Sequence, residues 1–237
     1  MYAAISGYAG TQPFNDWFSP DTTQRHALGV RIAAVDNFWG WGAFVYVKSA
    51  AAVLKGSVVV IDETYQATLV PNTPNQGFPV AVAMAPMASG TFGWVQIEGL
   101  TVYKTNATVA ADAAIGITAA GILGTNAAGK QILNCRNRIA ATGTKTFTAK
   151  TFNSLGYVDT VSGYDGAFLG MALSGTGIPA STVVAGLDPD GRRIYLGSAI
   201  GTFDKVATAT GSITLTGTYT GYGAGVINSP CAQGAIT

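Results

Sequence analysis

Charged residues are scarce in this sequence. They make up 11% of its 237 residues, against about 25% in typical globular proteins, whereas hydrophobic residues make up 48%. Disordered chains combine low hydrophobicity with high charge, so this composition predicts a folded protein. With so few ions, its surface must either be covered by Thr, Ser and Asn or be in contact with other proteins.

Neither sign of charge dominates, and no hydrophobic run is long. Thirteen basic and twelve acidic residues give a net charge of +1, and no basic run could neutralise a row of phosphates. The longest apolar stretches, 78–88 and 113–123, are shorter than the roughly 18–20 residues of a membrane span. The N-terminal decapeptide lacks the basic and hydrophobic regions of a secretion signal. We therefore expect no direct role with nucleic acid and no membrane association.

Cysteine and histidine are nearly absent. Cys135 and Cys231 are too few for a disulfide scaffold and lack metal-ligand spacing, so two reduced thiols in a protein made in a cytoplasm are expected. His26 is the sole histidine and hence the only possible base of a Ser-His-Asp arrangement, but no G-x-S-x-G elbow accompanies it. We expect His26 to be a surface or capping residue.

The acidic residues do not form a recognisable catalytic pair. Asp62 and Glu63 are adjacent, so on a strand they would point to opposite faces instead of facing each other across a cleft. Asp188 and Asp190 lie in a Pro-Gly turn without the further oxygen ligands of a calcium site. We therefore predict no catalytic residue, no metal and no cofactor, and a protein that is not an enzyme.

Two glycine-containing motifs resemble ligand-binding motifs but are better explained by structural roles. The motif "SGTGIP" (174–179) lacks the lysine of a phosphate-binding loop, so its glycines are expected to serve turn geometry. The motif "FWGWGAFVY" (38–46) could offer an aromatic platform for a sugar, or form a core strand whose glycines permit curvature. The second reading is favoured because aromatic residues generally dominate protein cores.

What the sequence has in abundance is β-strand signal. Short segments rich in Val, Ile, Thr and aromatic residues alternate with Gly, Pro, Asn and Asp. The Ala-rich pieces 49–54 and 107–114 could form short helical turns, but neither has a sustained helical period. The segment 187–196 predicts a hairpin that turns at 189–191. The expected strands are 28–35, 43–48, 57–61, 78–84, 94–103, 131–139, 144–152, 158–161, 168–173, 182–187, 192–197 and 212–219, with 225–227 as a further candidate.

The segment 93–117 predicts a bulge. Its apolar positions change parity at Gly99, as happens when one inserted residue turns all later side chains to the other face. The pattern predicts Leu100 and Val102 on the buried side, with Thr101 and Tyr103 facing the other way.

A weak internal echo is also present. Segment 45–60 aligns with 101–116 at an offset of 56 (104 − 48, the lysines Lys48 and Lys104), and a later match has an offset of 52 (129 − 77, two glycines). Both copies run from a strand through a lysine corner, an apolar stretch and a turn to a second strand. The echo predicts two related β units in one sheet system, although coincidence is the alternative.

Three segments differ in composition. We expect an extended N-terminal arm (1–27), an all-β domain of barrel or sandwich type (28–142), and a smaller Ig-like β-sandwich in the Thr/Gly-rich part (143–237), whose last strands could return to the first domain. The arm has no strand or helix period and must dock on its own domain or on a neighbour. Its aromatic residues are the predicted capsid or subunit interface: Tyr2, Tyr8, Phe14, Trp17 and Phe18.

Several short patterns between residues 25 and 140 are typical of one family. They are an L-G-x-R-[IV] strand, a Y-V-K-[SA] corner, x-G-x-[VI]-[VI]-x-[ID], W-V-Q before a glycine-containing strand, and V-A-A-x-x-x-[IL]-[GY]. They fall on Leu28–Ile32, Tyr46–Ser49, Gly56–Asp62, Trp94–Gln96 and Val109–Gly116. Through them the chain resembles head decoration (cement) and related capsid-associated proteins of tailed double-stranded DNA bacteriophages. Separately, 170–196 resembles the short β-sandwich modules of many phage structural proteins.

This resemblance implies a structural virion protein that binds the outer surface of the mature capsid and braces it against internal DNA pressure. Its implied partner is the major capsid protein lattice, and it would act as a homo-oligomer, a trimer or a dimer. It would be made in the host bacterial cytoplasm and end on the capsid exterior. The main alternative is a tail-fibre or surface adhesin module that binds a carbohydrate or protein receptor. A β-sandwich hydrolase and a major capsid subunit fit less well, because the first needs a carboxylate pair and the second a long spine helix.

Overall fold

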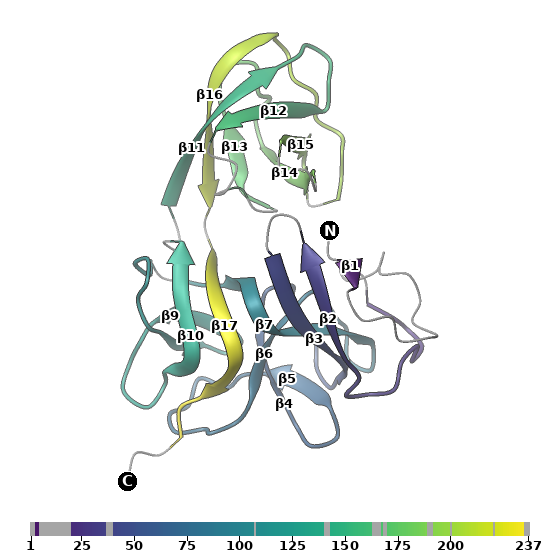
Figure 1. The fold of residues 1–237 in the computed structure, drawn as a ribbon, viewed down its shortest axis with the longest axis vertical. Coiled ribbons are helices and arrows are strands. Elements are labelled where there is room, and N and C mark those ends of the chain that lie inside the picture. Colours follow the sequence, from purple (N-terminus) through teal and green to yellow (C-terminus); the bar gives the residue numbers. More distant parts are fainter. Residues whose placement is uncertain are drawn as a thin grey trace. The chain divides into compact units, whose positions relative to one another are not determined.

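The fold is all-β, as predicted (Figure 1). A computed structural model describes residues 3–4, 20–36, 40–106, 108–139, 143–162, 167, 170–188, 192–199, 201–219 and 221–234. No helix occurs within these ranges, so the helical turns considered for the Ala-rich segments are not found there. The chain divides into two compact units, Met1–Ala141 with Gly221–Thr237, and Thr142–Thr220.

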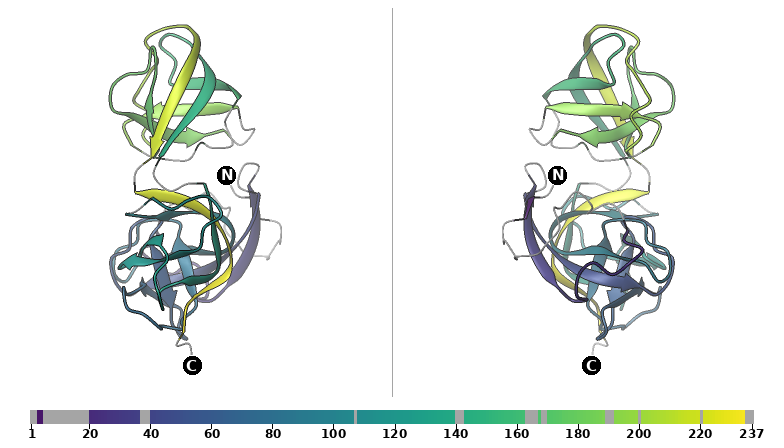
Figure 2. Two further views of the ribbon diagram at one scale, coloured as in Figure 1. Left: turned by 90° about the vertical axis from the view of Figure 1, so that its left-hand side faces the viewer. Right: turned by 90° about the vertical axis from the view of Figure 1, so that its right-hand side faces the viewer.

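The first unit contains a nine-stranded sheet and a separate two-stranded sheet. The order in the large sheet is β1-β2-β3-β5-β4-β6-β7-β17-β10, and β8 pairs with β9. In both views of Figure 2 the yellow strand β17 runs through this unit, although it comes last in the sequence. The strands are β1 (Ala3–Ala4), β2 (Arg31–Asp36), β3 (Gly40–Ser49), β4 (Val58–Ile61), β5 (Gln66–Leu69), β6 (Val80–Ala83), β7 (Phe92–Lys104), β8 (Ile115–Ala119), β9 (Ile122–Thr125), β10 (Ile132–Ile139) and β17 (Tyr222–Ala232).

A first ring of five strands closes because β3 pairs with β7 as well as with β5. The ring runs β3-β5-β4-β6-β7 and back to β3. Small and β-branched side chains fill it, as suits a barrel with few strands. Its buried residues include Val45, Val47, Val59, Ala81 and Val95.

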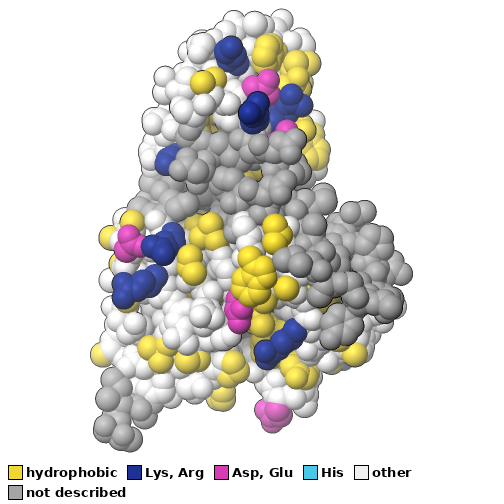
Figure 3. Space-filling model, viewed as in Figure 1, with side chains coloured by type: hydrophobic (Ala, Val, Ile, Leu, Met, Phe, Trp, Pro, Cys, Tyr) yellow, Lys and Arg dark blue, Asp and Glu magenta, His cyan; other side chains and the backbone are white. Residues whose placement is uncertain are grey.

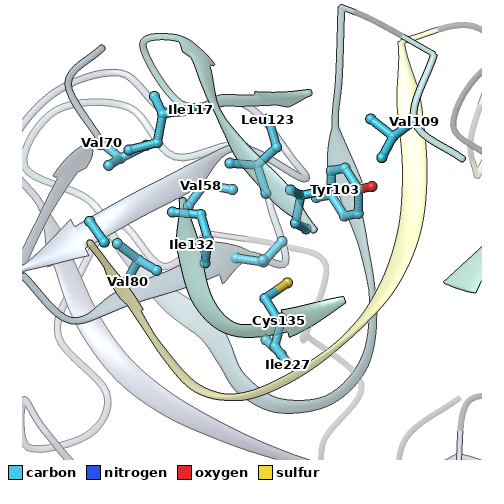
Figure 4. Packing of buried hydrophobic residues seen from close by; sticks show 13 residues of the cluster. Val58, Val70, Val80, Tyr103, Val109, Ile117, Leu123, Ile132, Cys135 and Ile227 are labelled. Carbon is cyan, nitrogen blue, oxygen red and sulfur yellow. The ribbon is translucent and has the colours of Figure 1, made fainter. Parts of the chain in front are cut away.

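A second ring of five strands shares β7 with the first. It runs β7-β9-β8-β10-β17, where the isolated bridges Thr105↔Leu123 and Gly116↔Gln131 join β9 to β7 and β8 to β10. Figure 4 shows its core, in which side chains from all of these strands converge. The largest cluster of the unit lies here and includes Tyr103, Ile115, Leu123, Ile132 and Ile227.

The two rings repeat one another, as the sequence echo predicted. Strands β3, β4, β5 and β6 are followed by β7, β8, β9 and β10 in the same order. The parallel pairing Ser49↔Ala67 recurs 56 positions later as Thr105↔Leu123 (105 − 49). Positive φ angles recur likewise, at 75° for Gly56 and 58° for Asp112. Strand β7 closes the first ring by pairing with both β6 and β3. Strand β17 closes the second ring in the same way, by pairing with both β10 and β7.

The predicted bulge in β7 is present, but the predicted burial after it is wrong. The bulge lies at Ile97, which has no partner between the pairs Phe44↔Gln96 and Ala43↔Glu98, two positions before the predicted Gly99. Gly99 itself is paired with Gly42 and has a φ of 101°. Tyr103 and Thr101 are then the buried residues, whereas Leu100 is partly exposed. The reason is that β7 leaves the first ring here, and only its face toward the β8–β9 hairpin is covered in the second ring.

The second unit is a six-stranded closed barrel in the order β11-β12-β15-β14-β13-β16. The sequence favoured an Ig-like sandwich for this part, and the correction is that the sheet closes on itself because β16 pairs with both β11 and β13. Buried Phe147, Met171, Ile194 and Leu215 fill its interior. The strands are β11 (Gly143–Thr151), β12 (Tyr157–Ser162), β13 (Ala172–Ser174), β14 (Thr182–Leu187), β15 (Arg193–Gly197) and β16 (Gly211–Tyr219).

Candidate interaction surfaces

The aromatic residues predicted to form an interface, Tyr2, Tyr8, Phe14, Trp17 and Phe18, lie outside the described residues. The described parts of the predicted arm contact their own chain. Ala3 and Ala4 pair with Val35 and Ala34 of β2, and Asp21 pairs with Phe92. The contact of the aromatic arm with a capsid or another subunit therefore stays a prediction.

His26 belongs to an aromatic cluster that fastens the end of the predicted arm to the sheet. Its ring lies edge-on to Tyr46, with centroids 5.0 Å apart, and 5.4 Å from Trp94. The Tyr46 hydroxyl donates to Asp21 Oδ2 at 2.8 Å, and Arg25 Nε pairs with the other carboxylate oxygen at 2.9 Å. Burial, helped by the Asp21 hydrogen bond, raises the pKa of Tyr46 to about 12. These contacts attach residues 21–26 to Tyr46 of β3 and Trp94 of β7.

Other acidic side chains stabilise turns and strand pairs. Asp62 accepts hydrogen bonds from the backbone of Gln66 and Thr64, both at 2.8 Å, and these bonds lower the pKa of Asp62. Asp112 pairs with Arg138 at 2.8 Å, between the loop after β7 and strand β10. Within the described part of the chain, no three His, Cys, Asp or Glu side chains gather as a possible metal site.

The aromatic motif 38–46 divides between core and surface. Phe44 and Tyr46 are fully buried in the core beside β2, as the core-strand reading predicted. Trp41 is 47% exposed on the opposite face of β3. A large aromatic ring left in contact with water on a regular strand is a common mark of a binding surface.

Trp41 lies in an apolar surface formed by β2, β3, β7 and β17, on the side of β3 that faces the interior of the first ring further along the strand, at Val45 and Val47. Cross-strand pairing fixes its members: Val35 lies opposite Trp41, and Leu100 lies opposite Val226. Figure 3 shows hydrophobic side chains gathered in this part of the first unit, with charged side chains at its border. We call this surface the Trp41 face; its residues are Ala33, Val35, Trp41, Ala43, Leu100, Val102 and Val226.

Charged residues border the Trp41 face. Glu98 lies opposite Ala43 and accepts a hydrogen bond from Ser229 at 3.0 Å. Arg31 extends the same face of β2, and Arg136 of β10 lies opposite Val226. An apolar centre with a polar rim is the usual anatomy of a protein–protein interface.

Gly99 lets β7 approach the β3 backbone closely at Trp41. At its φ of 101°, an added Cβ would overlap the Trp41 carbonyl oxygen and lie 2.9 Å from Gly42 Cα. Only glycine permits so close an approach of β7 to β3 at this bulge. At the Trp41 face, β7 therefore lies directly against the β3 backbone.

A second surface lies on the barrel of the second unit. Four aromatic rings form a row, with centroids 6.4 Å apart for Phe152–Tyr157, 6.2 Å for Tyr157–Tyr195 and 5.7 Å for Tyr195–Phe203. Tyr157 and Tyr195 are a cross-strand pair of β12 and β15, and both point away from the core because their neighbours Val158 and Ile194 are buried. We call these four residues the aromatic row.

Sequence reasoning missed the aromatic row. Its residues are up to 51 positions apart (203 − 152), and no single stretch of sequence displays them together. The available signal was the alternation Y-V-D at 157–159 and R-I-Y at 193–195, in which aromatic and charged residues flank one buried position. Only the pairing of β12 with β15 brings the two patterns side by side.

No family model, curated protein or solved structure matches this chain. The described residues also contain no helix with the length and apolar character needed to cross a membrane.

Proposed function

We propose that this protein is a structural virion protein, a decoration or cement protein that binds the outer surface of a tailed-phage capsid and stabilises the head lattice. The observation that carries the proposal is the Trp41 face, an exposed apolar patch on a rigid sheet in a chain with very few charges. Trp41 is 47% exposed, and Val35 and Val226 are each 37% exposed. Such a face would lose its contact with water on binding another protein, and tryptophan is frequent among the residues that dominate binding energy.

A repeating capsid would compensate for a modest single contact. A homo-oligomer, a trimer or a dimer, presents several identical faces at a symmetry axis of the lattice, so binding adds by avidity. The low charge also avoids desolvating ions at the contact. The implied partner is the major capsid protein, and the implied location is the exterior of the head.

The test is to mix the purified protein with mature capsids that lack it and to image the particles by cryo-electron microscopy. We expect density on the outer shell at symmetry-related positions. Trp41→Ala should weaken the binding at least tenfold, since a central interface tryptophan contributes about 2 kcal/mol or more. Leu54→Ala is the matched control, because Leu54 is 59% exposed in the same unit but lies off the face. Bare capsids, or equal binding by the two variants, would refute the role of the Trp41 face.

The aromatic row favours a second candidate function, that of an adhesin or tail-fibre module that binds a carbohydrate or protein receptor. Decoration of purified capsids by the wild-type protein would argue against this alternative as the main role.

A further inference from the structure

The aromatic row has the form of a ligand site. Gly156, Tyr157, Tyr195 and Phe203 line an open depression on the outside of the barrel, and its lining is apolar. Phe203 is 61% exposed although its ring is large and wholly hydrophobic. The barrel has a separate core of buried residues such as Phe147 and Ile194, so its packing does not require Phe203 at the surface.

Two local devices hold Phe203 in place. The Asp204 carboxylate accepts hydrogen bonds from the backbone N–H and the hydroxyl of Ser198, both at 2.7 Å, and these bonds lower the pKa of Asp204. On the other side, the Phe203 ring lies over Gly186 of β14, where an added Cβ would come within 2.9 Å of it. The exposed ring is therefore fixed before any ligand arrives, which reduces the entropy that binding would cost.

A charged row runs beside the aromatic row on the same face. Asp159 and Arg193 are opposite each other on β12 and β15, and Arg193 Nε lies 3.0 Å from Asp159 Oδ1. The Arg193 guanidinium also lies over the Tyr157 ring, 4.0 Å from its centroid. Hydrogen-bond donors and a carboxylate acceptor are thus placed directly beside flat aromatic surfaces.

This combination suits a sugar better than other ligands of similar size. A pyranose ring has an apolar C–H face that packs on aromatic rings, and hydroxyls that both donate and accept hydrogen bonds. Nucleic acid is disfavoured because residues 142–220 contain five basic and five acidic residues, whereas single strands require a positive groove. A polyproline segment offers carbonyl acceptors but no N–H from proline, so Asp159 would remain unused.

From these observations we infer that the aromatic row, with Asp159 and Arg193, is a binding site for a neutral saccharide. The sugar packs its C–H face on the exposed Phe203 ring, and the Tyr195 ring, tilted 76° to it, borders the site. The sugar hydroxyls exchange hydrogen bonds with Asp159 and with Arg193, which covers the Tyr157 ring. The inference does not depend on capsid binding, since the site lies wholly within the second unit.

The test is to titrate the full-length protein with neutral oligosaccharides, namely cellohexaose, maltohexaose, N-acetylchitohexaose and a β-1,4-galactan fragment, and to observe ligand-detected NMR saturation transfer and calorimetric heat. We expect at least one to bind with saturation. Phe203→Ala should raise its Kd about tenfold, since one aromatic contact is worth up to about 1.5 kcal/mol. Asp159→Asn should also weaken binding, because it removes the negative charge that strengthens the hydrogen bonds from sugar hydroxyls, without changing the size of the side chain.

Val161→Ala is the matched control, because Val161 is 62% exposed on β12 but lies outside the row. It should bind like the wild type. No binding to any of the four probes, or binding that survives both Phe203→Ala and Tyr195→Ala, would overturn the inference. Saturable binding of a polyproline decamer that these two variants abolish would assign the row to peptides instead. Capsid binding by Phe203→Ala measured in parallel separates this inference from the proposed function.

Discussion

Thr101 is a buried polar residue whose hydroxyl carries a cost. It is 3% exposed on the inner side of β7, and its Oγ1 has no hydrogen-bond partner among the described residues. A buried hydroxyl without a partner loses its hydration and gains nothing in return. Thr101→Val should therefore raise the free energy of unfolding by about 1 kcal/mol, measured by urea denaturation.

Thr182 provides the matched comparison for that substitution. It is 1% exposed, and its hydroxyl donates to the Pro179 carbonyl at 2.7 Å. Thr182→Val should lower stability by about 1 kcal/mol, because a made hydrogen bond is lost. A loss of stability in both variants would show that the Thr101 hydroxyl finds a partner.

Lys55 makes stability depend on pH. Its Nζ is buried, and burial lowers the pKa of Lys55 from 10.5 to about 8. Between these two values the unfolded chain binds more protons than the folded one, so stability rises with pH. Burial raises the pKa of the Cys135 thiol to about 12, from an ordinary value of 9.0, so this group lowers stability again above pH 9.

The free energy of unfolding should accordingly increase by about 1 kcal/mol between pH 8 and 9. Lys55→Met should remove most of this rise. Denaturant curves at several pH values measure the effect. An unchanged slope in the variant would assign the rise to another group.

At the scale of elements, the bulge of β7 determines which face of the sheet is exposed. Gly99→Ala should destabilise the protein by about 2–4 kcal/mol, because a Cβ there would overlap the β3 backbone in addition to straining a positive φ. Gly90→Ala isolates the strain: Gly90 has a φ of 83° but no atom within 4 Å of an added Cβ. It should cost only about 1–2 kcal/mol. Thermal unfolding compares the two, and equal losses would show that contact with β3 is unimportant.

The bulge also shows what could be predicted from the sequence. The parity change at Gly99 identified an irregularity that the structure places two residues earlier, at Ile97, because side-chain alternation is a local property of a strand. It did not identify the buried side. Tyr103 is buried because the β8–β9 hairpin and Asn137, which accepts its hydroxyl hydrogen bond at 2.7 Å, cover that face. These partners come later in the chain, and alternation alone says nothing about them.

Most strands were predicted for the same reason, and the order of elements in the two rings was visible as a repeat. The closure of the second unit into a barrel was not predicted, since it depends on β16 pairing with both β11 and β13, from residues far apart in the sequence. The two candidate surfaces could not be predicted from the sequence either. Trp41 lies in a motif that was recognised in the sequence, but its side chain is exposed because the first ring ends at this part of β3.

At the scale of the whole molecule, the second unit is inserted between two neighbouring strands of the first. Ile139 of β10 pairs with Ala224 of β17, so the ends of the insertion meet at one position. Each unit has its own buried core. Replacing residues 142–220 by a short Asn-Gly linker should therefore give a folded first unit in which β10 and β17 remain paired.

The shortened protein should unfold in a single cooperative transition and should retain binding to capsids if the Trp41 face is the contact. Circular dichroism and a capsid co-sedimentation assay measure these two properties. An insoluble or molten product would mean that the first unit requires the second for its stability.

The late position of β17 has a consequence for synthesis on the ribosome. The second ring lacks strand β17 until residues 222–232 have emerged from the ribosome. All strands of the inserted barrel are already present once residue 219 has been made. Because domains generally fold as units during translation, the barrel is able to form while β7 and β10 still have unpaired edges beside an open core. Strand β17, which is made after the inserted barrel, is thus the strand that completes the second ring.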